Sequence, residues 1–271
     1  MKLKQYMLFG GRSACSFIVL FVFFSTTVLT AYGEIIQLLE DQQEADGLPK
    51  NWRPLTFSKI FRHTEYKLIQ EGNRPVITAT SRQSASGIYR SLDLHPNEYP
   101  ILSWCWKVNR VITQGVTTPA GDETKKSGDD YAARIYVTFK FEPNNATFWE
   151  RTKFGTIKTI YGEYPPKGVL NYVWAGHLPI GTSFSNPYTD RAKMVVVESG
   201  NEKAMQWVCE EHNLYEDYKR LFGEEPPVFS GVAVMTDTDN TGGEATAYYA
   251  DLVLQQTRRQ NMEPVSGRFS K

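Results

Sequence analysis

The sequence predicts an all-β protein, a jelly-roll-like β-sandwich of two antiparallel sheets with one short helix. Three observations favour this fold class. Short segments of alternating apolar and polar residues recur along the chain, turn residues such as those at 71–73 separate them, and aromatic residues, which suit strands, make up 13% of the chain. We expect one sandwich domain over residues 52–256, between a lead-in at 34–51 and a flexible polar tail at 257–271.

The first 33 residues have the layout of a secretory signal peptide. Lys2, Lys4 and Arg12 form a basic leader, residues 17–29 are almost uninterruptedly apolar, and small residues end the segment at 31–33. An uncleaved anchor is the alternative, but the apolar run is shorter than the roughly 20 residues of a spanning helix. We therefore expect cleavage before position 34, a periplasmic or secreted location, and no membrane span once the leader is removed.

The charge and the cysteines of the mature chain limit its partners and its compartment. Removal of the leader takes away three basic residues and no acidic one, which leaves 27 basic and 30 acidic residues. This balance provides no basic footprint for nucleic acid. Cys105 and Cys209 remain. An oxidising compartment would permit a disulfide between them, and two buried thiols fit the sequence equally well.

The strand prediction follows the alternating segments in order. The expected strands are residues 65–70, 75–81, 87–94, 101–108, 132–141, 156–161, 169–174, 193–198, 205–211, 228–236 and 245–255. The longest polar insertion, residues 113–128, is predicted to be a mobile loop. One helix is expected after Asn213, which can cap it, with Glu216 three residues later and Gly223 as its end.

The most informative segment is residues 128–139, which begins Gly-Asp-Asp-Tyr. Because side chains alternate along a strand, Arg134 and Tyr136 share a polar face opposite an apolar one, and Asp129 and Asp130 stand at its rim. An arginine there could hold a carboxylate or a pair of sugar hydroxyls. The alternative is that Arg134 pairs with Asp130, or with an acid of a neighbouring strand, and seals the sheet.

Two aromatic segments add candidate ligand residues. In residues 101–108, Trp104 and Trp106 share a side with aliphatic residues, which favours the core, whereas Lys107 faces the other way and could contact a ligand. In residues 171–177, Tyr172 and Trp174 could line a groove. The four histidines lack zinc-ligand spacing, and no nucleophile elbow, Walker loop or zinc-protease motif is present. No cofactor is therefore predicted from motifs.

Residues 236–243 are a candidate calcium loop. Asp237, Asp239 and Asn240 offer oxygens that suit a hard cation. The loop departs from an EF-hand, because Tyr248 stands where the twelfth-position glutamate should be. Asx-rich turns also arise for conformational reasons alone, so calcium and a plain turn both stay open.

Taken together, these segments resemble the DUF3047 family, a bacterial secreted family without an established activity. The resemblance runs from about Trp52 to Leu254 and implies an exported single domain. Its carriers are residues 84–87, Trp104-x-Trp106-Lys107, 128–134, 171–174 and 236–241. The last expected strand, residues 247–254, is also similar to the closing strand of jelly-roll carbohydrate-binding modules, which is a likeness of fold alone.

Three hypotheses of function follow from these patterns. The first is a binding module for a glycan or another polar envelope ligand, whose site comprises Lys107, Arg134, Tyr136, Asp129, Asp130 and Trp174. The second is a polysaccharide lyase or glycoside hydrolase, in which Asp130 would need a distant acid such as Glu198 or Glu210 as its partner. The third is a structural envelope protein whose polar clusters serve stability.

Overall fold

The computed structural model describes residues 34–114, 118–119, 122–145 and 164–256. The predicted signal peptide, the polar tail and the predicted strand at 156–161 lie outside the described residues. In the described part of the chain no helix is long and apolar enough to cross a membrane.

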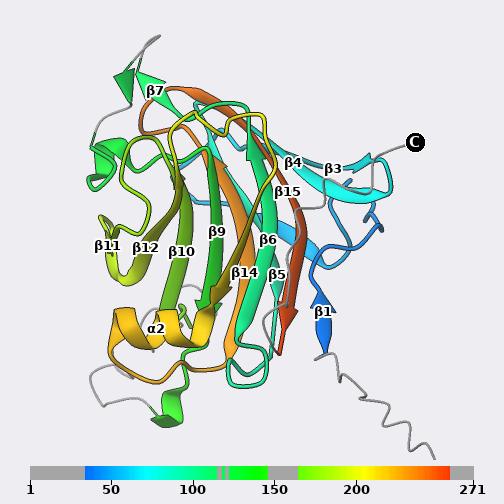
Figure 1. Ribbon diagram of the computed structural model, residues 1–271, viewed down its shortest axis with the longest axis vertical. Coiled ribbons are helices and arrows are strands. Elements are labelled where there is room, and N and C mark those ends of the chain that lie inside the picture. The colour runs from blue at the N-terminus through cyan, green and yellow to red at the C-terminus, as the bar shows by residue number, and fades with distance from the viewer. Residues whose placement is uncertain (1–33, 115–117, 120–121, 146–163, 257–271) are drawn as a thin grey trace, which may run out of the picture. The chain divides into compact units, whose positions relative to one another are not determined.

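Two β-sheets form the protein (Figure 1). The first has six strands, in the order β13-β6-β15-β4-β3 with β1 paired to β15. Its strands are β1 (Ile35–Gln37), β3 (Glu65–Glu71), β4 (Arg74–Arg82), β6 (Ile101–Val108), β13 (Val208–Asn213) and β15 (Glu244–Gln255).

The second sheet has seven strands, in the order β11-β12-β10-β9-β14-β5-β2. They are β2 (Trp52–Leu55), β5 (Ala85–Ser91), β9 (Ala133–Phe139), β10 (Gly168–Ala175), β11 (Ser183–Asn186), β12 (Thr189–Ser199) and β14 (Phe229–Asp237). A small separate ribbon pairs β7 (Thr113–Gln114) with β8 (Thr118–Pro119).

The chain passes repeatedly from one sheet to the other, as it does from β4 to β5, from β5 to β6 and from β14 to β15. This exchange is typical of jelly rolls, so the predicted fold class is confirmed. One strand pair differs from the expected antiparallel arrangement: β10 and β12 run parallel, since β11 and its flanking loops carry the chain back before β12 begins.

Aromatic residues of both sheets meet in the core. Trp104 and Trp106 of β6 are buried, as expected, and the Trp104 ring centre lies 5.4 Å from that of Tyr172 on β10. The Trp106 and Trp174 ring centres are 5.8 Å apart. The inner faces of the two sheets are therefore filled by large rings, and any ligand has to bind an outward face, an edge or a loop.

Most of the predicted elements are present. The expected strand at 205–211 begins later, at Val208, because Met205 adopts a left-handed backbone with φ of 63°. Within the described residues of the predicted loop at 113–128, the structure has β7, β8 and a 3-10 turn, η1 (Lys126–Gly128); a second such turn, η2, spans Pro143–Asn145. The short strands β1, β2 and β11 were not expected, because each has too few residues to show an alternating pattern.

The helix α2 (Leu214–Phe222) has the ends that the sequence predicts. The Asn213 side chain accepts a hydrogen bond from the Glu216 backbone N–H at 3.1 Å. Gly223 ends the helix with φ of 73°, a left-handed conformation that glycine adopts without a Cβ clash. Leu214 and Tyr218 are buried against the sheets.

Candidate functional site

One row of side chains crosses the outward face of the seven-stranded sheet. Strand register places Tyr89 of β5 beside Ala233 of β14, and Ala233 beside Tyr136 of β9. Asn171 of β10 follows Tyr136 in the same row. Because the preceding residues on these strands, such as Ile135, point into the core, this row faces away from it. We call Tyr89, Ala233, Tyr136 and Asn171 the tyrosine row.

The tyrosine row alternates large and small side chains. Tyr89 and Tyr136 are half-buried, and the side chain between them, Ala233, is only a methyl group and 3% exposed. Adjacent strands lie about 4.8 Å apart, so the two tyrosine backbones stand about 10 Å from each other. The two rings therefore lie on either side of a strand that presents only the methyl group of Ala233 between them.

Asn171 is the unusual member of the row. Its side chain is buried, and its Oδ1 has no hydrogen-bond partner among the described residues. Within the described part of the chain its Nδ2 donates to the sulfur of Met194, at 3.1 Å. Buried polar atoms are nearly always satisfied, so this enclosed amide oxygen beside the outward-facing Tyr136 is a candidate contact for a bound water.

Arg134 lies in the next row of β9 and supports Tyr136. Its Nη1 donates to the Tyr136 hydroxyl at 3.2 Å and to Asp129 Oδ1 at 3.2 Å. Its Nε donates to Asp237 Oδ1 at 2.8 Å, and its Nη2 donates to Asp237 Oδ2 and to the Asp129 carbonyl. All five guanidinium donors are used in this way, so Arg134 positions its neighbours and has no donor left for a ligand.

The electrostatics of this group follow from its burial. Burial raises the pKa of Asp237 well above its usual range and raises the pKa of Asp129, in both cases against the opposing effect of Arg134. Burial alone would lower the pKa of Arg134, but the two carboxylates raise it well above its usual range. Burial also raises the pKa of Tyr136, so its hydroxyl stays protonated, and it donates to the sulfur of Met235 at 3.6 Å.

Asp130 has a different role from that of its neighbour Asp129. Its Oδ1 accepts hydrogen bonds from the backbone and side-chain nitrogens of Asn240, at 3.2 and 3.1 Å. Its Oδ2 accepts from the backbone and hydroxyl of Thr241, at 2.7 and 2.6 Å. Asp130 thus fixes the turn after β14. Of the two partners expected for Arg134, Asp130 or an acid of a neighbouring strand, the structure shows the second, because Arg134 pairs with Asp237 of β14 and also with Asp129.

Part of the predicted calcium group is brought together. Asp130, Asp237 and Asp239 each offer a carboxylate oxygen within 4.8 Å of the others. The Oδ1 of Asn240, the third predicted ligand, accepts a hydrogen bond from the Tyr188 hydroxyl at 3.1 Å. The donors are of the type that calcium prefers, although three are fewer than its usual six to eight.

Most of the chain matches one protein family. Residues 50–253 match the family described as protein of unknown function, DUF3047. The chain belongs to the DUF3047 family. No curated protein sequence matches it.

Solved structures similar to this DUF3047 protein are carbohydrate-binding modules and glycoside hydrolases. The family 11 carbohydrate-binding module of a cellulosomal cellulase of Clostridium thermocellum is 9% identical, with a TM-score of 0.41, over 84% of this chain and 99% of that one. A family 12 cellulase derived from that of Rhodothermus marinus is 13% identical, with a TM-score of 0.40, over 82% and 100%. The family 12 xyloglucanase of Bacillus licheniformis is 6% identical, with a TM-score of 0.39, over 82% and 100%.

Lys107 and Trp174 do not belong with Arg134 and Tyr136. Lys107 is on β6 of the other sheet, where its Nζ lies 3.4 Å from Glu71 Oε1. Trp174 is fully buried on the core side of β10 and donates from Nε1 to a backbone carbonyl at 3.0 Å. Alternation along a strand does not show to which sheet the strand belongs, which is why the position of Lys107 was not foreseen. It also does not show which face of β10 points into the core, which is why the position of Trp174 was not foreseen.

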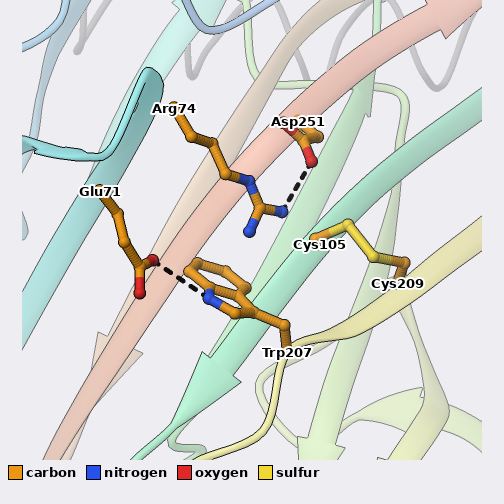
Figure 2. The surroundings of a disulfide bond; sticks show 6 residues. All are labelled: Glu71, Arg74, Cys105, Trp207, Cys209 and Asp251. Carbon is orange, nitrogen blue, oxygen red and sulfur yellow. Dashed lines mark hydrogen bonds and ion pairs between the residues drawn. A yellow bond between two sulfur atoms is a disulfide. The ribbon is translucent and has the colours of Figure 1, made fainter. Parts of the chain in front are cut away.

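Cys105 and Cys209 form a disulfide that joins β6 to the edge strand β13. Figure 2 shows Trp207 beside this bond, with its indole N–H donating to Glu71 at 3.1 Å. The Arg74 guanidinium lies 4.1 Å from the centre of the Trp207 ring and 2.6 Å from Asp251. The charged residues around Trp207 are therefore paired with one another, which is the arrangement of a structural cluster.

The acids proposed as partners of Asp130 in an enzyme lie elsewhere. Glu198 is opposite Trp174 in the parallel β10–β12 register, on the core side, and pairs with Lys203 at 2.6 Å. Glu210 lies on the inward face of β13, beside Trp104. Asp130 instead braces the turn after β14, so the structure does not bring it together with either glutamate.

Sequence reasoning missed several residues that position the site. Glu123 is buried and accepts the backbone N–H groups of Gly176, His177 and Leu178, at 2.5, 3.1 and 3.3 Å, which anchors the segment that leads to Asp129. Nothing in the polar stretch around Glu123 indicates this contact. Tyr89 had a signal, because it alternates with a buried isoleucine in a predicted strand.

Proposed function

We propose that this DUF3047 protein is a binding module for a glycan or another polar ligand of similar size, which lies across the tyrosine row. The observation that carries this proposal is the juxtaposition of two half-buried tyrosines on either side of Ala233. Beside Tyr136, the enclosed Oδ1 of Asn171 has no hydrogen-bond partner among the described residues. Folded proteins rarely leave a buried polar atom without a partner unless a water, an ion or a ligand provides one.

The chemistry of the row suits a sugar. A tyrosine ring presents an apolar face that can pack on the C–H face of a pyranose, and its hydroxyl can hydrogen-bond to the sugar's own hydroxyls. Binding sites commonly combine such aromatic surfaces with a few fixed polar groups. In this site Arg134 fixes the Tyr136 hydroxyl, and Asp129 and Asp237 fix Arg134. Because folding already fixes these side chains, little side-chain entropy is lost when a ligand binds, and this favours affinity.

Binding to an array of bacterial-envelope and plant polysaccharides tests the proposal. Wild-type protein is expected to bind a subset of the glycans, and Tyr89→Ala or Tyr136→Ala is expected to weaken binding to them at least tenfold. Tyr248→Ala is the matched control, because Tyr248 is also a half-buried tyrosine but belongs to β15 of the other sheet. Absence of any bound glycan, or equal losses in all three variants, would overturn the proposal.

The proposed location is the periplasm or the cell exterior. The layout of the first 33 residues and the pairing of Cys105 with Cys209 support it, because disulfides persist mainly in oxidising compartments. Cell fractionation followed by intact-mass measurement tests it. A mass that begins at residue 34 in the exported fraction is expected, and a reduced, full-length cytoplasmic chain would contradict it.

Calcium is a second proposed ligand, at Asp130, Asp237 and Asp239. The supporting observation is local charge. Asp129 and Asp237 pair with the single guanidinium of Arg134, while Asp130 and Asp239 lie beside Asp237. Mutual repulsion and burial make such a group costly, and a divalent cation would offset part of that cost. Asp239 would be the main test residue, since it is the most exposed of the three.

A further inference from the structure

The loop between β2 and β3 presents aromatic side chains to solvent. Phe61 is 92% exposed and Phe57 is 39% exposed, and Ile60 between them is partly exposed. Phe61 is the most exposed of the large hydrophobic side chains in the described part of the chain. Large apolar side chains gathered in one exposed loop generally indicate a contact surface.

The same loop is basic. Residues 56–63 contain Lys59, Arg62 and His63 and no acidic residue, whereas the mature chain as a whole has an acidic excess. The nearest acid along the chain after the loop, Glu65, is already paired with Lys67 at 2.5 Å. Lys67, and to a smaller extent Arg82, lowers the pKa of Glu65, and Arg82 also pairs with Glu244 at 4.0 Å.

The loop is held in this position by its own backbone and by its ends. The Ile60 N–H donates to the Phe57 carbonyl at 2.9 Å, which forms a turn between the two phenylalanines. The Arg62 carbonyl accepts from the Ala85 N–H at 3.1 Å, and the Thr64 hydroxyl donates to the Thr236 carbonyl at 2.7 Å. The bonds of Arg62 and Thr64 therefore fix the chain after Phe61 to the body of the protein, and the turn between Phe57 and Ile60 orders the chain before it.

We propose that the loop at residues 56–63 docks the protein on an anionic lipid bilayer. Phe57 and Phe61 insert at the boundary between headgroups and acyl chains, while Lys59 and Arg62 contact the lipid phosphates. Peripheral membrane binding depends on this combination of buried apolar area and attraction to anionic lipid. The charge of the loop is the reason for choosing a lipid surface over a neutral apolar partner. The inference does not depend on glycan binding, because the tyrosine row and this loop share no residue.

The expected losses of vesicle binding follow from the burial of phenylalanine and from the attraction of the basic residues to anionic lipid. Burial of a phenylalanine contributes roughly 1.5–3 kcal/mol, so Phe61→Ser should lower the vesicle partition coefficient about tenfold or more. Each basic residue near an anionic surface contributes about 1 kcal/mol, so Lys59→Gln and Arg62→Gln should each lower it about fivefold. The charge effects, but not the phenylalanine effect, should diminish in high salt.

Co-sedimentation with vesicles tests the proposal. The protein is used in the form in which it is purified from expressing cells. Vesicles of equal parts phosphatidylcholine and phosphatidylglycerol are compared with vesicles of phosphatidylcholine alone. Wild type should bind the anionic vesicles preferentially, the double variant Phe57→Ser, Phe61→Ser should lose that binding, and Ile180→Ser should keep it. Ile180 is a matched control because it is 58% exposed in another loop.

Three outcomes would overturn the proposal. If the wild type binds neither kind of vesicle, the loop does not bind a lipid surface, and a protein partner becomes the alternative. Equal binding to both vesicles removes the role of the basic residues. A double variant that still binds shows that another segment is responsible, the apolar stretch in the first 33 residues included.

Discussion

Arg134 and Asp237 form a two-point ion pair, in which Arg134 Nε donates to Asp237 Oδ1 at 2.8 Å and Nη2 donates to Oδ2. The residues are 103 positions apart in the sequence, and the pair joins β9 to β14 on the outward face of the seven-stranded sheet. Both side chains are at most 3% exposed. The pair is therefore part of the frame on which the tyrosine row is built.

Arg134→Ala should destabilise the protein by about 3–5 kcal/mol, because it leaves buried carboxylates without a counter-charge. The double variant Arg134→Ala, Asp237→Ala should lose less than the sum of the two single variants, since neither charge then remains unpaired. Urea unfolding of the four proteins measures both quantities. Strictly additive losses would show that the two residues do not interact.

Removal of the disulfide should also destabilise the fold. The bond closes a span of 104 residues, and bonds of this kind typically contribute about 2–4 kcal/mol, mainly by restricting the unfolded chain. The double variant Cys105→Ser, Cys209→Ser should therefore unfold at lower urea concentration. A reducing agent should lower the midpoint of the wild type and leave that of the variant unchanged. A wild type indifferent to the reductant would contradict the expectation.

Stability should fall as the pH rises from about 4.5 to about 7. Burial, assisted by the nearby Glu198, raises the pKa of Glu210 to about 7 from an ordinary value near 4.5. Below 4.5 the group is protonated in both states. Between the two values only the unfolded state ionises, so the folded state loses stability, by about 3 kcal/mol in all; above 7 the loss is complete.

The pH effect depends on the groups that face Glu210. Glu198 and Lys203 lie beside it, and His212 Nε2 is 4.0 Å from its carboxylate. Glu210→Gln should flatten the stability profile between pH 4.5 and 7, as measured by thermal unfolding across that range. Asp217 is a useful contrast, because hydrogen bonds from His212, Arg220 and Tyr172 overcome its burial and lower its pKa to about 2. Its contribution is lost only as the pH falls toward 2. An unchanged profile in Glu210→Gln would refute the assignment.

Calcium should raise the melting temperature, and a chelator should remove the rise. A ligand present at about 100 times its Kd stabilises the folded state by about 2.7 kcal/mol. Asp239→Asn should abolish the effect, whereas Asp93→Asn, at an exposed acid paired with Lys140, should keep it. Identical melting curves with calcium and with chelator would exclude the site.

The sequence predicted the fold better than the site. Alternation identified the strands and placed Arg134 and Tyr136 on one face, because period two is a local property. The partner of Arg134 is not local: Asp237 comes from a strand 103 residues away, and no pattern within either segment indicates the pair. It appeared in the sequence only as a candidate calcium ligand.

The two faces of β10 show a second limit of sequence reasoning. Tyr172 and Trp174 alternate with Asn171 and Val173, and all four are buried. Because neither face is markedly polar, the sequence does not show which set points into the core. The rings were assigned to a groove, whereas the structure puts them between the sheets and turns Asn171 outward beside Tyr136.

A crystal structure with the most tightly bound oligosaccharide from the array is the most direct test of the central claim. We predict a sugar ring over Ala233 between Tyr89 and Tyr136. A ligand bound instead beside Trp207 and Tyr248 on the six-stranded sheet would contradict the claim.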